Sequence, residues 1–296
     1  MIIVTGATGH LGHAIVEKLV ERVPPNQVGA SVRDQAKAAG LVALGVRVRQ
    51  GDFDDSTSLR HAFEGATQVL IVSSNALAHG GDTLAQHRSA INAARAVGAG
   101  RIVYTSHMAA SGSSAFPPML GHAGTEDMLG QSGLAWTALR NGFYAASGIM
   151  LMGDALTTGV LEAPADGKVS WTAHADLAEA AAIILANQGR YDGPTPPLTG
   201  SQSLDLADLA GIASELLDRP VRRQLLTDGD LRERMAARGA ADRAADMVRG
   251  LYIASRAGEF APVDPTLERL LGRPPIKMRD LIAKKLATAR LPAAVA

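Results

Sequence analysis

Short apolar runs rich in β-branched residues recur through the first half of the chain and alternate with segments of helical periodicity. Each run is too short to form a helix of its own and is followed by polar residues or glycine. The six runs are Ile2–Val4, Val28–Val32, Val46–Val48, Val69–Val72, Ile102–Tyr104 and Trp136–Leu139. This alternation predicts parallel strands joined by crossover helices.

The first crossover shows the clearest helical pattern. Leu11, Ile15, Leu19 and Val23 recur every four residues and form one apolar stripe, and the Pro24-Pro25-Asn26 run ends the helix. Together with its two strands this helix makes a βαβ unit of about 30 residues. Three more helices are expected between the later runs, over Ser58–Phe63, Leu84–Val97 and about Leu120–Gln131. The pattern predicts an α/β fold with a doubly wound parallel sheet of the Rossmann type.

The rhythm of the sequence changes after Tyr144, and residues 148–164 are rich in Met, Gly and Leu. Helical patterns then follow over Asp176–Ala186, Leu204–Leu217, Leu231–Tyr252 and Leu267–Leu286, the last interrupted by Gly272 and Pro274-Pro275. We predict a larger α/β domain over residues 1–150 and a smaller, mostly helical lobe over 151–296. The segment from about 172 to 199 is expected to return to the first sheet, and the tail at 291–296 is expected to be loose.

Composition narrows the classes of function. Lys plus Arg and Asp plus Glu number 29 each, so the formal charge is zero and nucleic acid is not an expected partner. The chain has no cysteine, which excludes disulfides, a thiolate nucleophile and a cysteine-ligated metal. The opening residues resemble neither a signal peptide nor a membrane span. We therefore expect a cytoplasmic protein without a membrane partner, and a homodimer as the commonest arrangement.

A glycine-rich loop lies between the first strand and the first helix. It reads Gly6-Ala7-Thr8-Gly9-His10-Leu11-Gly12, with glycine at the first, fourth and seventh positions. Glycine there permits a tight turn and close approach to a pyrophosphate, and the helix N-terminus supplies unpaired N–H groups for the anion. A dinucleotide fits this place, and an ordinary glycine-rich turn is the alternative. The expected cofactor contacts are Gly6, Thr8, Gly9, His10, Leu11 and Gly12.

The residue after the second strand distinguishes NAD from NADP. An acidic residue there binds the ribose diol of NAD, whereas a basic residue accommodates the 2′-phosphate of NADP. Arg33 occupies this place, with Lys37 one helical turn later if a helix has begun. We therefore predict NADP(H) as the cofactor. A solvated surface charge next to Asp34 is the alternative role of Arg33.

An acidic cluster follows the third strand. The Asp52 carboxylate can accept a hydrogen bond from an adenine amino group, and Phe53 can flank the ring. Capping of the next helix is the competing role of this cluster, since Asp54 and Asp55 are equally suited to it. Asp52 and Phe53 are therefore included as expected cofactor contacts.

An ordered set of motifs resembles the NmrA-like branch of the atypical short-chain dehydrogenases/reductases, in particular its NADPH-dependent quinone reductases and triphenylmethane reductases. The likeness covers nearly the whole chain and is carried by Gly6–Gly12, Arg33, Asp52-Phe53, Val69–Ser74, Tyr104-Thr105-Ser106 and Leu139–Tyr144. The resemblance implies a Rossmann-type NADP-binding domain, a small C-terminal lobe and a substrate cleft between them.

Ordinary members of the superfamily use a tyrosine as the acid, with a lysine four residues later. This chain has His122 and Glu126 at those positions. Four residues apart on a helix, the carboxylate is expected to orient the imidazole and raise its pKa, and a helix-surface pair is the alternative. Two ligands at this spacing without an identified third do not predict a metal site.

Further candidates follow the ends of the fourth, fifth and sixth runs, where an open α/β sheet binds its ligands. Hydroxyl groups there are expected to touch the cofactor, with turn formation or loop capping as the alternative; these residues are Ser73, Ser74, Thr105 and Ser106. The resemblance implies that Asn141 and Tyr144 shape the nicotinamide or substrate pocket. The expected catalytic set is His122, Tyr144, Asn141 and Ser106.

These observations predict an NADPH-dependent reductase that delivers hydride to a small aromatic, quinone-like acceptor. Such an acceptor, or a triarylmethane cation, is electrophilic enough to take hydride without the usual Tyr/Lys pair. One alternative is a redox sensor that binds NADP without turning it over. Another is an imine, enone or ketone reductase with His122 or Tyr144 as proton donor.

Overall fold

The computed structural model describes residues 1–290, which form two compact units, and the tail predicted to be loose lies outside them. The first unit comprises Met1–Ser113, Pro118–Asn141 and His174–Leu198. The second comprises Ser114–Pro117, Gly142–Ala173 and the residues from Thr199 onward. The second unit thus takes over at Gly142, nine residues before the lobe expected to begin at residue 151, and the stretch that returns to the first unit begins at His174.

The first unit is built on a parallel sheet of seven strands in the order β3-β2-β1-β4-β5-β6-β8. Six strands fall on the predicted apolar runs: β1 (Ile2–Thr5), β2 (Val28–Val32), β3 (Arg47–Gln50), β4 (Gln68–Ile71), β5 (Arg101–His107) and β6 (Ala135–Asn141). The two-residue β8 (Gly193–Pro194) pairs with β6 at one edge, and β3 forms the other edge. The predicted doubly wound parallel fold is confirmed.

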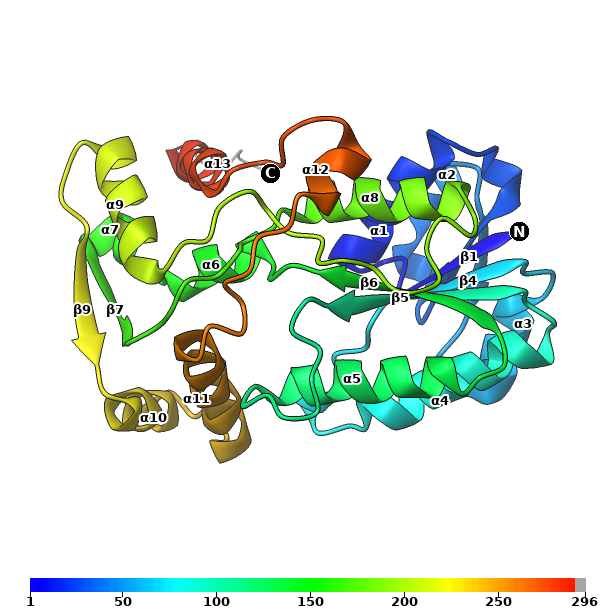
Figure 1. The fold of residues 1–296 in the computed structure, drawn as a ribbon, viewed down its shortest axis with the longest axis horizontal. Helices are drawn as coiled ribbons and strands as arrows, with labels where there is room; N and C mark the ends of the chain where they lie inside the picture. The colour runs from blue at the N-terminus through cyan, green and yellow to red at the C-terminus, as the bar shows by residue number, and fades with distance from the viewer. Residues whose placement is uncertain (291–296) are drawn as a thin grey trace. The chain divides into compact units, whose positions relative to one another are not determined.

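Helices cover both faces of this sheet (Figure 1). One face carries α1 (His10–Val20), α2 (Ala39–Ala43) and α8 (His174–Ala186), and the other carries α3 (Ser56–Phe63), α4 (Thr83–Ala96) and α5 (Pro117–Gly130). Three short 3₁₀ segments, η1 (Pro25–Gln27), η2 (Gln35–Lys37) and η3 (Ala76–His79), complete the connections. The apolar stripe of α1 is buried at Leu11, Ile15 and Leu19, as its periodicity predicts.

The second unit is mostly helical around one small sheet. Its two strands, β7 (Val160–Pro164) and β9 (Arg222–Leu226), run parallel and pair with each other. The helices are α6 (Ala145–Leu151), α7 (Ala155–Thr158), α9 (Leu206–Leu217), α10 (Asp228–Ala237), α11 (Asp242–Arg256), α12 (Thr266–Leu271) and α13 (Met278–Arg290). Among the described helices, none combines the length and apolar character that a membrane span requires.

One helix prediction in this unit was wrong. The pattern over Leu231–Tyr252 forms two helices, α10 and α11, because the chain turns at Gly239 with φ +78°. That left-handed conformation is open to glycine at little cost and ends a helix.

Candidate functional site

The glycine loop places the backbone where a side chain would not fit. Gly6 has φ +57°, and a Cβ added to Gly12 would lie 2.3 Å from the Gly6 carbonyl oxygen. Gly9 caps α1 without a side-chain hydrogen bond, and the first turn carries no acidic residue. The N–H groups at this helix end therefore remain available to an anion, and the loop fits a pyrophosphate.

Three non-glycine residues of the loop were expected to touch the cofactor, and they differ in exposure. Thr8 and His10 are exposed, whereas Leu11, in the first turn of α1, is buried. The His10 ring lies 4.6 Å from that of His174, centroid to centroid. Thr8 and His10 are therefore open to a ligand from solvent, while Leu11 offers its backbone.

Arg33 is exposed directly after β2 and forms no ion pair or hydrogen bond with residues 1–290. Its neighbour Asp34 is engaged elsewhere, because the carboxylate accepts from the Ala36 N–H at 3.0 Å and pairs with Lys37 at 3.7 Å. Lys37 lies in η2, and this exposed ion pair with Asp34 is its contact in the described chain. Arg33 is the basic group here that is free to meet a phosphate.

The aspartates of the acidic cluster after β3 have different hydrogen-bond partners. Asp55 caps α3, accepting from the N–H groups of Thr57 and Ser58 at 2.9 and 3.2 Å. Asp52 does not cap this helix; its carboxylate accepts from the Asp54 N–H at 3.1 Å. The role predicted for Asp52 toward adenine remains a prediction.

Phe53 packs inward from the same loop. Its ring is partly buried against the core of the first unit and meets that of His87 edge to face, 6.2 Å between centroids. This core contact accounts for part of the ring surface that was expected to flank an adenine.

Hydroxyl groups tie the end of β4 to its neighbours. The Thr5 hydroxyl accepts from the Val72 N–H at 2.9 Å, and the Thr105 hydroxyl accepts from the Ser73 N–H at 2.8 Å. The Ser74 hydroxyl donates to the Gln86 side chain. Thr105 and Ser74 therefore shape the segment that follows β4, which is the role weighed against direct cofactor contact.

The pairing predicted between His122 and Glu126 was wrong. The Glu126 carboxylate accepts from Arg140 Nη2 at 2.7 Å and Nε at 3.2 Å, and from the Ser106 hydroxyl at 2.6 Å. The carboxylate is thus saturated by partners from β5 and β6. Burial lowers the pKa of His122 to about 4, so the imidazole is neutral near pH 7, and the expected rise in its pKa does not occur.

Tyr104 is the functional candidate that sequence reasoning missed. It lies fully buried in β5, and its hydroxyl is 2.7 Å from His122 Nδ1 and 3.4 Å from the Ser73 hydroxyl. A tyrosine inside an apolar strand was the available signal, since a buried phenol needs a hydrogen-bond partner.

Asn141 ends β6 with a buried side chain, 2% exposed. Within the described chain its Oδ1 atom has no hydrogen-bond partner. Buried polar atoms are nearly always paired in proteins, so an unpaired acceptor at this edge of the sheet is a place for a ligand donor.

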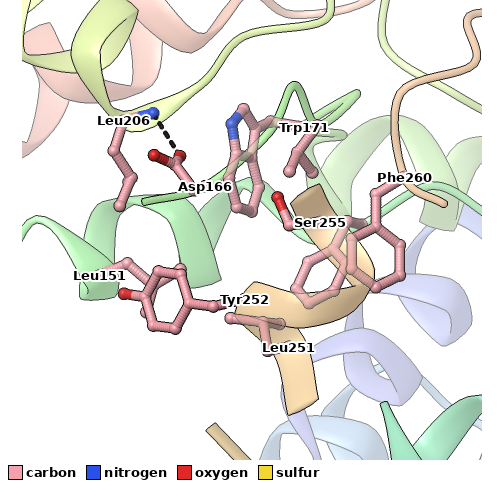
Figure 2. A pocket seen from close by; sticks show the side chains of 10 residues that line it. Leu151, Asp166, Trp171, Leu206, Leu251, Tyr252, Ser255 and Phe260 are labelled. Atoms are coloured by element: carbon pink, nitrogen blue, oxygen red, sulfur yellow. Dashed lines mark hydrogen bonds between the residues drawn. The ribbon is translucent and has the colours of Figure 1, made fainter. Parts of the chain in front are cut away.

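The second unit contains Tyr144 and a compact apolar pocket. Tyr144 is half-buried at the N-cap of α6. The pocket is lined by aromatic and aliphatic side chains, including Trp171, Tyr252 and Phe260, as Figure 2 shows. Asp166 also lines it; its carboxylate accepts from the Leu206 N–H at 2.8 Å, and burial raises its pKa.

Comparison with known proteins gives a consistent picture. A family profile described as NAD(P)H-binding matches residues 6–188. Quinone oxidoreductase 2 of Escherichia coli (strain K12) is 36% identical over 286 residues, covering 96% of this chain and 98% of that protein.

Two solved structures share the fold over almost the whole chain. The NADPH complex of an NADPH-dependent quinone oxidoreductase from Escherichia coli has a TM-score of 0.89 at 34% identity, covering 97% of this chain and 100% of that one. The NADP(H) complex of triphenylmethane reductase from Citrobacter sp. has a TM-score of 0.85 at 28% identity, covering 96% of this chain and 99% of that one.

Proposed function

The chain belongs to the NAD(P)H-binding family of oxidoreductases, and we propose that it is an NADPH-dependent reductase that passes hydride to an electrophilic aromatic acceptor such as a quinone. Arg33 is the residue that supports a preference for NADPH over NADH. Its guanidinium is exposed after β2 and free of partners in the described chain, while Asp34 is committed to Lys37. A free guanidinium at this position suits a 2′-phosphate.

The residues around the glycine loop would hold the rest of the cofactor. The backbone of Gly6–Gly12 and the uncapped start of α1 suit the pyrophosphate. Asn141 Oδ1, at the end of β6, would accept from an N–H or O–H of the bound cofactor or acceptor. When bound, NADPH supplies the hydride.

The acid–base groups support an acceptor that needs no strong acid. His122 is neutral near pH 7 because burial lowers its pKa to about 4. Glu126 is occupied by Arg140 and Ser106 and is not available to charge the imidazole. Quinones and triarylmethane cations accept hydride through their own electrophilicity, whereas a simple ketone requires protonation of its oxygen.

The experiment that tests this function follows NADPH oxidation by the purified protein against quinones, triarylmethane dyes, enones, ketones and imines, with NADH in parallel. We expect turnover with quinones or dyes, preference for NADPH, and none with simple ketones. Tight NADPH binding without turnover on any acceptor would contradict the proposal and indicate the redox sensor instead.

A further inference from the structure

Three side chains from three elements form a line of oxygen and nitrogen atoms in the first unit. Ser73 follows β4, Tyr104 lies in β5, and His122 lies in α5. The Tyr104 hydroxyl stands between the other two, 3.4 Å from Ser73 Oγ and 2.7 Å from His122 Nδ1. Its ring is fully buried, whereas Ser73 and His122 are each half-buried. The line therefore passes through a buried phenol between two groups that reach the surface.

The outer nitrogen of His122 is open to a ligand. Nδ1 is engaged by Tyr104, and within residues 1–290 Nε2 has no hydrogen-bond partner and is not enclosed. A neutral imidazole that accepts the phenol proton at Nδ1 carries its own proton on Nε2. Of the two neutral tautomers, the one with its proton on Nε2 accepts from Tyr104 at Nδ1 and presents an N–H outward.

The other titratable groups packed around His122 are committed to different partners. His87 of α4 accepts from the Ser74 N–H at Nε2 (2.9 Å) and contacts Thr125 at Nδ1 (2.8 Å). His107 of β5, whose ring centroid is 5.9 Å from that of His122, accepts from the Ala109 N–H at 3.1 Å. The Glu126 carboxylate is held by Arg140 and Ser106, as described above. Among the described side chains, Tyr104 is therefore the one that hydrogen-bonds the His122 ring, at Nδ1.

We propose that His122 donates the proton that completes the reduction of a quinone-type acceptor. Tyr104 is the positioning residue, because it supplies a proton to Nδ1 and keeps the imidazole neutral while His122 donates. This inference rests on the proposed function. Hydride transfer to a quinone builds negative charge on a quinone oxygen. In the same step His122 Nε2–H gives its proton to that oxygen, while the Tyr104 hydroxyl gives its proton to Nδ1. The ring stays neutral, and the Ser73 hydroxyl, 3.4 Å from the Tyr104 oxygen, would turn to donate to the transient phenolate.

The cycle closes with one proton from solvent. Water returns a proton to Nε2, and the Nδ1 proton passes back to Tyr104. The sum is NADPH plus a proton plus quinone giving NADP⁺ plus hydroquinone. The proton moves from one phenol to the anion of another, oxygens of similar basicity, which is the condition under which general acid transfer is efficient.

Two classes of acceptor differ in whether their reduction needs a proton. A quinone takes up hydride and a proton, whereas a triarylmethane cation becomes its neutral leuco form by hydride alone. A proton relay therefore matters for the quinone and not for the dye. A merely structural defect would slow both reactions together.

The test measures single turnovers of NADPH oxidation with a quinone and with a triarylmethane dye. Tyr104→Phe removes one oxygen and keeps the ring; we expect quinone reduction to slow roughly tenfold or more, with dye reduction unchanged. The dependence on deuterium fraction should be curved in the parent protein, where two protons move together, and linear in Tyr104→Phe. Tyr191→Phe, a half-buried tyrosine of the same unit that belongs to neither site, is the matched control and should leave both rates unchanged.

His122→Gln provides a second variant should Tyr104→Phe not fold, and it should slow quinone reduction by about 10²-fold while sparing the dye. Equal slowing of both acceptors, or unchanged quinone reduction in both variants, would overturn the relay. If the parent protein reduces neither acceptor, the proposed function itself fails and the relay fails with it. Parent turnover with unaffected variants removes the relay alone.

Discussion

The guanidinium of Arg140 holds both oxygens of the Glu126 carboxylate, with Nη2 to Oε2 at 2.7 Å and Nε to Oε1 at 3.2 Å. This two-point contact joins β6 to α5, and the Ser106 hydroxyl adds a third hydrogen bond from β5. It ties a nearly buried carboxylate to the sheet, one turn of α5 away from the contact between His122 and Tyr104.

Removing the Glu126 charge should destabilise the first unit. Glu126→Gln leaves Arg140 without its counter-ion, and we expect the free energy of unfolding to fall by about 2 kcal/mol, less than for a fully enclosed pair because Arg140 is one-third exposed. Denaturant titration measures this change. Asp242→Asn, which breaks the exposed Arg232–Asp242 pair, is the control and should cost under about 1 kcal/mol. Equal losses in the two variants would refute the structural role of Glu126.

Arg33→Ala should weaken NADPH binding by about 10- to 100-fold and leave NADH binding nearly unchanged, as expected for loss of a charged hydrogen bond to phosphate. Lys37→Ala is the matched control, because this nearby basic residue is committed to Asp34. Fluorescence titration with both cofactors reports the two affinities. The same loss for NADPH and NADH would contradict the assignment of the phosphate to Arg33.

Gly12→Ala should abolish cofactor binding, because its Cβ would lie 2.3 Å from the Gly6 carbonyl oxygen and push the loop apart. Gly211→Ala is the control within helix α9, where an added Cβ meets nothing within 4 Å. That variant should gain about 0.5–1 kcal/mol of stability from helix propensity. Calorimetry with and without NADPH measures both effects. Normal NADPH binding by Gly12→Ala would mean that the loop does not hold the cofactor.

Stability should fall in mild acid. Burial lowers the pKa of His122 to about 4 and that of His87 to about 3, and it holds the pKa of His107 well below its usual range. The unfolded chain protonates these rings near pH 6.5, so below that pH it binds more protons than the folded chain. Stability is therefore fully present above about pH 6.5 and declines toward pH 4.

Thermal melts between pH 8 and pH 4 would show this decline. Each pKa unit corresponds to about 1.4 kcal/mol per group at most, so the combined effect should be visible as a steep fall in Tm. His87→Gln should flatten the curve if His87 is one of the groups responsible. A Tm that stays constant through this range would contradict the neutral, buried state of these rings.

The first sheet was predictable because five of its six longer strands contain an apolar run followed by polar residues. The edge strand β3 has Val48 as its one apolar residue and was located from the Val46–Val48 segment. Two other strands lack that signal: β8 has only two residues, and β9 begins with two arginines and a glutamine before its two leucines. The glycine loop and Arg33 were predictable for the same reason, since they follow strands whose ends were already located.

The inner part of the site depends on contacts between distant elements. Helix spacing suggested that Glu126 would serve His122, but Arg140 of β6 is the stronger partner, with charge and two hydrogen bonds. Tyr104 has the sequence pattern of a core residue. Its hydrogen-bond partner His122 is 18 positions further along the chain, so the sequence alone does not pair them. Periodicity reports which face of an element is buried and does not report which polar groups meet there.

The two outer strands of the seven-stranded sheet are poorly suited to pairing with a strand of another chain. At one margin, the Arg47 and Arg49 side chains of β3 fold back onto carbonyl groups of residues 61–64. At the other, β8 is two residues long and contains Pro194, which has no N–H to donate. Neither margin is a good template for an incoming strand, so this sheet resists growth by the pairing of strands at its edges.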